Sequence, residues 1–149
     1  MDLQKELKIS RFESAHQQAI VNVFFTYNWC NTHMKKTMSP YDITIQQFNI
    51  LRILRGQNPT PCSVNTLKER MLDKMSDASR IVDRLVQKGL VMKSTSATDK
   101  RSVDVVITRK GLLLLKQIDL EVDLSAMVAP NLSIEEATQL NMLLDKLRG

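Results

Sequence analysis

The feature that most constrains this fold is the segment of residues 76–111, in which a helical pattern is followed at once by two strand-like runs. Apolar residues recur in its first part at three- and four-residue spacing, which predicts a helix with one buried side. These residues are Ala78, Ile81, Val82 and Leu85. Gly89 stands where the pattern stops, and we expect the helix to end there because glycine enters the left-handed conformation without a side-chain penalty.

The two runs that follow predict a β-hairpin with a long loop. Residues 90–94 form the first run, and residues 102–108 mostly alternate apolar and polar side chains, as a half-buried strand does. The loop of residues 95–101 is polar, ends in Lys100 and Arg101, and is too long for a two-residue turn. Such a hairpin projects from the fold, and a helix followed by a projecting hairpin is the order found in winged helices that contact DNA.

Basic residues gather in the same part of the chain. The net charge is +5, and residues 68–110 hold eleven lysines and arginines against six acidic residues, whereas residues 111–149 are net acidic. Phosphate contacts and counterion release require positive charge in a segment that touches DNA. A solvated basic face would give the same pattern, so charge alone does not decide between the two interpretations.

Length and composition favour one largely helical domain. A chain of 149 residues can bury a core, and only four glycines and four prolines interrupt it. The start of the chain lacks the apolar segment of a signal peptide. The longest leucine run, residues 112–115, is far shorter than the roughly 20 residues that span a bilayer. We expect a soluble, cytoplasmic protein without membrane contact.

Three residue pairs match the spacing of a capping box, in which two side chains satisfy backbone donors at a helix N-terminus. The pairs are Ser10 with Glu13, Thr44 with Gln47, and Ser133 with Glu136. Together with apolar periodicity they predict helices with approximate bounds of 11–36, 45–55, 66–72, 109–127 and 134–149, and a very short strand at 62–64. The further boundary predictions are a stop at Gly56, a cap at Asn65 and a cap at Thr108.

The helices at the two ends of the chain, about 11–36 and 112–149, bracket a central module at about 45–110. The first helix carries apolar residues on two sides, with Phe25 and Trp29 lying off its main stripe. Terminal helices of this kind can bury their extra apolar surface only against each other or against another subunit. We therefore predict a single domain over residues 1–149 that forms a homodimer through its terminal helices.

Short motifs resemble, in order and spacing, the MarR family of bacterial winged-helix regulators. SRIVDRL at residues 79–85 is followed by KGLV at 88–91, DKR at 99–101 and ITRKG at 107–111. They match the family's recognition helix, first wing strand, wing tip and entry into the following helix. The resemblance implies a mainly α winged helix-turn-helix with a small β-hairpin wing, flanked by N- and C-terminal dimerisation helices. It also implies a dimer that places two recognition helices in successive major grooves of a pseudo-palindromic double-stranded DNA site.

The resemblance further implies which residues contact DNA. Ser76, Ser79 and Arg80 would approach bases or phosphates, and Arg84 would contact the backbone or hold the wing. Arg101 would enter or flank the minor groove, where narrow A·T-rich stretches attract a guanidinium group. For Arg84 and Arg101 the alternative interpretation is a solvated or internally paired surface charge.

Three more wing residues belong to the same predicted interface. Asp99 would hold Arg101 by an ion pair, and Lys100 adds a cation at the wing tip. Lys93 stands where the family often has arginine, whose planar fork makes bidentate contacts that lysine cannot make.

Two aspartates depart from what phosphate contact favours. Asp77 and Asp83 fall on or beside the predicted recognition helix, where a negative charge repels the DNA backbone. They could instead accept a hydrogen bond from cytosine. They equally suit a winged helix that binds another protein rather than an operator.

All seven aromatic residues fall within the first third of the chain. Family members commonly bind small aromatic or phenolic molecules between the dimerisation helices and the DNA-binding module, which implies an effector pocket here. The candidate residues are Phe25, Trp29, Cys30, His33 and Phe48. Ordinary core and dimer packing would explain the same aromatics. Cys30 also suggests peroxide sensing by a thiol of lowered pKa, with an inert buried thiol as the alternative.

The leading functional hypothesis is a dimeric, sequence-specific DNA-binding transcriptional regulator, a repressor released from its operator by a small-molecule effector. The alternatives are a thiol-based redox-sensing regulator that uses Cys30 and a winged-helix protein-interaction module without operator specificity. Two cysteines and two histidines form no metal-ligand spacing, and no phosphate loop or nucleophile elbow is present. Neither catalysis nor a metal or other cofactor is expected.

Overall fold

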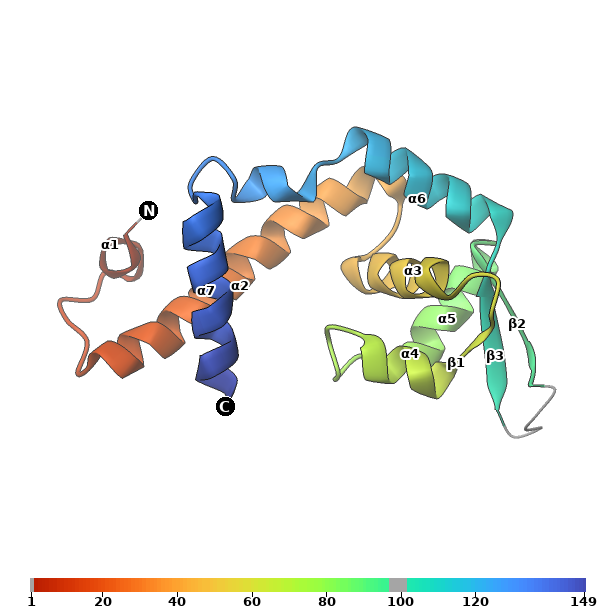
Figure 1. Ribbon diagram of the computed structural model, residues 1–149, viewed down its shortest axis with the longest axis horizontal. Helices are drawn as coiled ribbons and strands as arrows, with labels where there is room; N and C mark the ends of the chain where they lie inside the picture. Colours follow the sequence, from red (N-terminus) through yellow and green to blue (C-terminus); the bar gives the residue numbers. More distant parts are fainter. Residues whose placement is uncertain (1, 97–101) are drawn as a thin grey trace.

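The computed structural model describes residues 2–96 and 102–149, which form a mainly helical fold with one small sheet (Figure 1). In chain order the elements are α1 (Leu3–Leu7), α2 (Ala15–Met38), the 3-10 helix η1 (Ser39–Tyr41), α3 (Ile45–Gln57), β1 (Cys62–Ser63), α4 (Val64–Arg70), α5 (Ala78–Gln87), β2 (Val91–Thr95), β3 (Val103–Ile107), α6 (Arg109–Glu121), the 3-10 helix η2 (Leu124–Met127) and α7 (Ile134–Arg148). The predicted mainly α fold with a small β wing is confirmed.

The helix α2 extends from the rest of the molecule as an arm (Figure 1). In this view α7 crosses the arm, while α3, α4, α5 and the sheet lie together beyond its C-terminal end, and α6 leads from β3 back over α3. We call the part from α3 through α6 the winged-helix module. Within the described residues, no helix is long and apolar enough to span a membrane.

The hydrophobic core belongs almost entirely to the winged-helix module. Among the described residues, every fully buried apolar side chain lies between Met38, the last residue of α2, and Ile118 in α6. Leu51 of α3, Leu67 of α4 and Leu85 of α5 are completely enclosed there. The arm adds only its C-terminal part, with Met38 enclosed and Met34 packed against the core, and α7 has no buried residue, so the module is the folded centre of the described chain.

The sheet has the strand order β1-β3-β2, with both pairings antiparallel. Cys62 pairs with Val105, and on the other side of β3 Val91 pairs with Ile107. Gly111, in the first turn of α6, comes very close to this sheet, because a Cβ atom there would lie 2.4 Å from the carbonyl oxygen of Leu90. No side chain fits at that position without a shift of the backbone.

The end of the helix α5 is formed as the sequence predicts. Gly89 adopts φ +70, and its N–H donates to the carbonyl oxygen of Val86 at 2.9 Å. The N–H of Leu90 donates to the carbonyl oxygen of Leu85 at 3.0 Å, and both leucines are buried. These two bonds make a Schellman motif, which turns the chain directly into β2.

Two of the three predicted capping boxes are confirmed and one is wrong. Thr44 and Ser133 cap α3 and α7 with both reciprocal hydrogen bonds. Ser10 caps no helix: α2 begins at Ala15, and the hydroxyl of Ser14 accepts from the N–H of Gln17 at 3.1 Å. The cap therefore lies four residues after the predicted one, at a serine with an extended backbone that precedes the first helical residue.

Other boundaries differ from the predictions for local reasons. Ser63, rather than Asn65, caps α4, because its hydroxyl accepts from the N–H of Thr66 and the helix starts earlier. α3 continues through Gly56 to Gln57. α6 is capped by Thr108 as predicted, but it ends at Glu121 instead of continuing to Met127. Val122 is extended there, and the carboxylate of Asp123 caps the separate helix η2 by accepting from Ser125.

Candidate nucleic-acid interface

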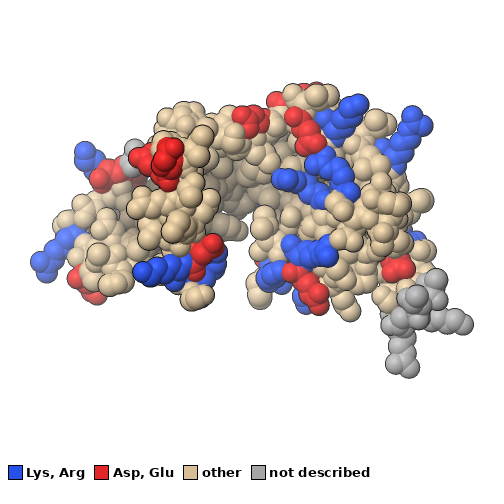
Figure 2. Space-filling view, in the orientation of Figure 1, with Lys and Arg blue, Asp and Glu red and all other residues tan. Residues whose placement is uncertain are grey.

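The helix α5 presents a polar outer face on a buried apolar one. Ala78, Val82 and Leu85 are buried in the module, as the periodicity predicts. The exposed side chains on the other side are Ser79, Arg80, Asp83, Arg84 and Gln87. In the view of Figure 2, lysine and arginine side chains are spread over the winged-helix half of the molecule. A helix exposed on one side in this way can lie in a major groove.

Asp77 has a structural role at the start of this helix. Its carboxylate accepts a hydrogen bond from the N–H of Arg80 at 3.1 Å, so Asp77 is the N-cap residue of α5. A carboxylate satisfies a backbone donor there and is favoured by the partial positive charge of the helix end. Helix capping thus explains why an acidic residue stands at the start of a helix that is expected to face phosphates.

Asp83 is paired with Lys93 across the angle between α5 and the wing strand β2. The amine of Lys93 donates to a carboxylate oxygen of Asp83, and the side chains of Lys93 and Asp83 are 46% and 53% exposed. The pair cancels a negative charge on the outer face of α5. The ion pair also occupies the amine of Lys93, a residue that the sequence analysis predicts to contact DNA.

The turn between α4 and α5 is held by Asp73. The hydroxyl of Ser76 donates to its carboxylate at 2.6 Å, and the N–H of Met75 donates to it at 3.0 Å. These bonds, the hydroxyl bond first, hold the pKa of Asp73 below its ordinary value. Ser76, predicted to approach DNA, is half-buried, and its hydroxyl proton is used inside this turn.

A groove of about 450 Å³ lies between the start of α4 and the start of α5. Asn65, Lys68 and Lys74 line it together with Ser76 and Ser79. The sequence interpretation missed Asn65, Lys68 and Lys74, although two lysines flanking the turn of a helix-turn-helix could have indicated them. They lie beside the recognition helix, where the first helix of this motif crosses the DNA backbone.

The predicted wing-tip residues Asp99, Lys100 and Arg101 lie outside the described residues. The strands that lead to them are paired to their ends, since Thr95 pairs with Val103. The contacts of these three residues with DNA therefore stay a prediction.

The five predicted effector residues do not meet in one pocket. Phe25 and Trp29 line a hollow of about 280 Å³ beside α1 and Asn131, and the exposed ring of His33 lies with its centroid 4.5 Å from that of Trp29. Cys30 lines a different hollow, between α2 and the α4–α5 turn. Phe48 is buried in the core beneath the guanidinium group of Arg52, 5.8 Å from its ring centre.

The hollow beside Cys30, which we call the α2 groove, has a volume of about 380 Å³. It lies between α2 and the α4–α5 turn, and its lining is mainly apolar, with Tyr27, Met34, Ile45 and Leu72. Figure 2 shows an open notch between the α7 end and the winged-helix half of the molecule.

The two cysteines lack the environment of a reactive thiolate. Burial raises the pKa of Cys30, with a smaller opposing effect of a backbone hydrogen bond, and burial likewise raises the pKa of Cys62. Peroxide-reactive thiols need the opposite shift. Among residues 2–96 and 102–149, no group of three potential ligands is arranged to hold a metal ion.

These features define the class of winged-helix DNA-binding proteins. They are a half-buried helix-turn-helix, its exposed basic recognition helix, and a paired wing hairpin. Residues 43–103 match the model of the MarR family. The chain is 33% identical over 117 residues to the multiple antibiotic resistance protein MarR of Escherichia coli, covering 76% of this chain and 79% of that protein. It is 32% identical over 113 residues to the MarR protein of Salmonella typhimurium, covering 74% and 76% of the two chains.

The fold is also similar to solved structures of MarR proteins. A mutant MarR from E. coli in complex with operator DNA superposes with a TM-score of 0.77 at 27% identity, covering 99% of both chains. A MarR-like transcription regulator from Bacillus cereus gives a TM-score of 0.78 at 25% identity, covering 89% of this chain and 95% of that one. The chain therefore belongs to the MarR family and is a DNA-binding transcription regulator, not an enzyme.

Proposed function

We propose that this protein is a dimeric repressor that binds a pseudo-palindromic operator and is released from it by a small aromatic or phenolic effector. The observation that carries the proposal is the outer face of α5. Its two aspartates are engaged in a helix cap and an ion pair, while the side chains of Ser79, Arg80 and Arg84 remain exposed. The relative from E. coli that binds operator DNA has the same fold.

The terminal helices support a dimer with residues about 11–36 and 112–149 as its interface. The 15-residue α7 has no buried residue, and most of its large apolar side chains are exposed. On α2, Phe24 is 65% exposed and Tyr27 is 60% exposed. An isolated helix of this length is only marginally stable in water, and a large exposed apolar surface marks an interaction site. A second copy that packs on these helices removes the surface from water.

In such a dimer each α5 enters a major groove, and the two grooves lie about one helical turn apart. Ser79 and Arg80 lie at the N-terminal end of α5, which approaches base edges, and Arg84 lies one turn further along. Lys68 and Lys74 of the neighbouring groove suit phosphate contacts. We expect Arg101 to add the minor-groove contact of the wing.

The α2 groove is the place that we propose for the effector. Its volume of about 380 Å³ lies within the range of small-molecule sites. Its lining is mainly apolar, and its polar groups include the amides of Asn31 and Gln46 and the charged side chains of Asp73 and Lys74. It touches both the arm and the α4–α5 turn, so a ligand bound there contacts both parts at once. A ligand that prefers the DNA-free arrangement shifts the protein away from the operator.

Two observations weigh against the alternative functions. The raised pKa of Cys30 disfavours thiolate-based redox sensing. Asp77 and Asp83, which motivated a protein-interaction module, have structural partners in Arg80 and Lys93.

The test combines the oligomeric state with DNA binding. Light scattering should give twice the mass of the chain, and selection from a random duplex library should yield a two-fold related sequence. Arg84→Gln should weaken binding to that duplex and make its dependence on salt shallower by about 0.9 for each phosphate that is no longer neutralised. The matched control is Arg11→Gln, since Arg11 is also an exposed arginine but lies before α2. A monomer, or a protein that selects no sequence, would contradict the proposal.

A further inference from the structure

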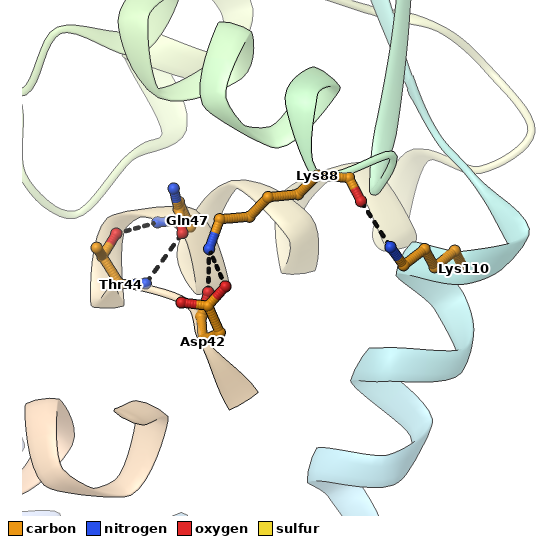
Figure 3. A network of polar contacts seen from close by, with 5 residues as sticks. All are labelled: Asp42, Thr44, Gln47, Lys88 and Lys110. Atoms are coloured by element: carbon orange, nitrogen blue, oxygen red, sulfur yellow. Dashed lines mark hydrogen bonds and ion pairs between the residues drawn. The ribbon is translucent and has the colours of Figure 1, made fainter. Parts of the chain in front are cut away.

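A network of polar contacts links the end of α5 to the segment before α3 and to the first turn of α6 (Figure 3). Lys88 is the C-cap residue of α5, and its amine donates to the backbone carbonyl oxygen of Asp42 and, at 2.9 Å, to its carboxylate. The carbonyl oxygen of Lys88 accepts from the amine of Lys110 at 2.8 Å. Lys88 thus touches the segment before α3 and the first turn of α6.

Asp42 belongs to the segment of residues 39–44, which we call the α2–α3 corner. It has φ 52, and its N–H donates to the carbonyl oxygen of Ser39 at 3.1 Å. The next helix starts shortly afterwards with the capping box of Thr44 and Gln47, whose two hydrogen bonds both measure 3.1 Å (Figure 3). Because the corner is fixed by its own hydrogen bonds, a contact to Asp42 bears on the direction of α2.

Hollows flank this contact, and the side chain of Asp42 is 95% exposed. A hollow of about 660 Å³ lies on one side of Lys88, lined also by Lys35 and Arg84. A second hollow of about 390 Å³ is lined by Lys88, Asp42 and Leu113. Close packing is what normally holds elements at a fixed distance. Ile43 anchors the corner in the core in this way, and the contact of Lys88 with Asp42 adds a polar link at the surface between the two hollows.

The length of α2 magnifies any change at the corner. Its 24 residues span about 36 Å at the rise of an α-helix. A rotation of about 5° at the corner therefore moves the far end of the arm by about 3 Å. This is close to the separation of neighbouring base pairs, since about 10 base pairs occupy about 34 Å of duplex.

We propose that Lys88 is a positioning residue that, through Asp42, sets the angle between α2 and the recognition helix. In a dimer joined through its arms, this angle determines how far apart the two copies of α5 lie. Lys88 thereby determines which half-site spacing the protein accepts, without contacting DNA. The inference rests on the proposed dimeric DNA-binding function.

The experiment measures spacing selectivity. A duplex selected by the unaltered protein is remade with one base pair inserted or deleted between its half-sites, and affinities for the three duplexes are compared. We expect the unaltered protein to bind either altered duplex about tenfold more weakly, a penalty typical of one unfavourable base-pair position. Lys88→Met, which keeps the apolar stem and removes the amine, should reduce this preference to about threefold or less. Lys88→Arg keeps a donor and should restore it.

Three comparisons separate this role from others. Lys116→Met on α6 removes the same charge from a side chain that makes no hydrogen bond or ion pair with the rest of the described chain, and it should keep the full preference. The salt dependence of Lys88→Met should equal that of the unaltered protein, because a lysine that neutralised a phosphate would make it shallower by about 0.9 on removal. Asp42→Asn keeps the backbone acceptor and should have a smaller effect than Lys88→Met.

The Lys88→Met protein should fold, because α6 is also held by Tyr41, whose hydroxyl donates to Glu121 at 2.7 Å, and by the ion pair of Arg55 with Asp119. An unchanged preference in Lys88→Met, or a shallower salt dependence, overturns the positioning role while leaving the proposed function intact. Failure of the unaltered protein to select any sequence overturns the proposed function itself.

Discussion

Asp83→Asn should increase the affinity of this protein for DNA, although it removes an ion pair. In the folded protein the amine of Lys93 is bound to the carboxylate of Asp83 beside the outer face of α5. The substitution removes one negative charge from that face and releases one cation on the wing strand. Both changes favour contact with phosphates.

The magnitudes for stability and for DNA binding differ greatly. The two side chains are 46% and 53% exposed, so solvent screens the pair, and removing it should cost less than about 1 kcal/mol of folding free energy. One released lysine that reaches a phosphate contributes about fivefold in affinity at about 0.15 M salt, or about thirtyfold for the two subunits of a dimer. The salt dependence should become steeper by about 1.8 for the dimer.

Fluorescence anisotropy with a labelled duplex at several salt concentrations measures both the affinity and its salt dependence. The double variant Asp83→Asn with Lys93→Gln should return to the original slope, because the released amine is then absent. Asp83→Glu should resemble the unaltered protein. An Asp83→Asn protein whose salt dependence is unchanged or shallower would show that Lys93 does not face the DNA backbone, and the reasoning would fail.

Three further outcomes are expected. Gly111→Ala should lower the free energy of unfolding by about 1–2 kcal/mol in chemical denaturation, since a Cβ there meets a backbone oxygen at 2.4 Å. Gly56→Ala, with nothing within 4 Å of its Cβ, should raise it by up to about 1 kcal/mol, and equal effects would contradict the steric argument. The hydrogen bond from the hydroxyl of Tyr41 lowers the pKa of Glu121. This hydrogen bond therefore stabilises the folded protein fully at pH values above the ordinary carboxyl pKa, and the stabilisation is lost as pH falls through the lowered pKa of Glu121. Tyr41→Phe should therefore be less stable than the unaltered protein at about pH 7, and the difference should shrink as pH falls below the ordinary carboxyl range, followed by circular dichroism; a difference that stays constant with pH would exclude the link. Peroxide should leave DNA affinity unchanged in both the unaltered protein and Cys30→Ser, because burial raises the pKa of that thiol; a decrease confined to the unaltered protein would restore the redox hypothesis.

Local patterns predicted much of the fold. The end of α5 at Gly89, the caps at Thr44, Thr108 and Ser133, and the two wing strands depend on residues that are close in sequence. Where local patterns competed, as at Ser10 and Ser14, the sequence allowed more than one boundary, and the predicted one was wrong. The family, too, could be identified from short motifs in a fixed order.

The candidate site was predicted less completely, because its charges are assigned by long-range contacts. Nothing local indicates that Lys93 pairs with Asp83, or that Lys88 reaches Asp42, which is 46 residues away. The effector candidates show the same limit. Phe25 and Cys30 lie on one helix, yet they line different hollows because they face different neighbours.

Sequence patterns were sufficient to predict the longer helices and both wing strands, although not the short helix α1, and to indicate that the recognition helix carries exposed cations. Helix periodicity, capping and glycine turns act over three or four residues, so they can be recognised along the chain. Sequence patterns do not show which of those charges are already paired, or that α7 lies outside the core, and both became visible in the folded chain. Pairing and burial depend on how α5 packs against the wing and the α2–α3 corner, and that packing brings together residues distant in sequence.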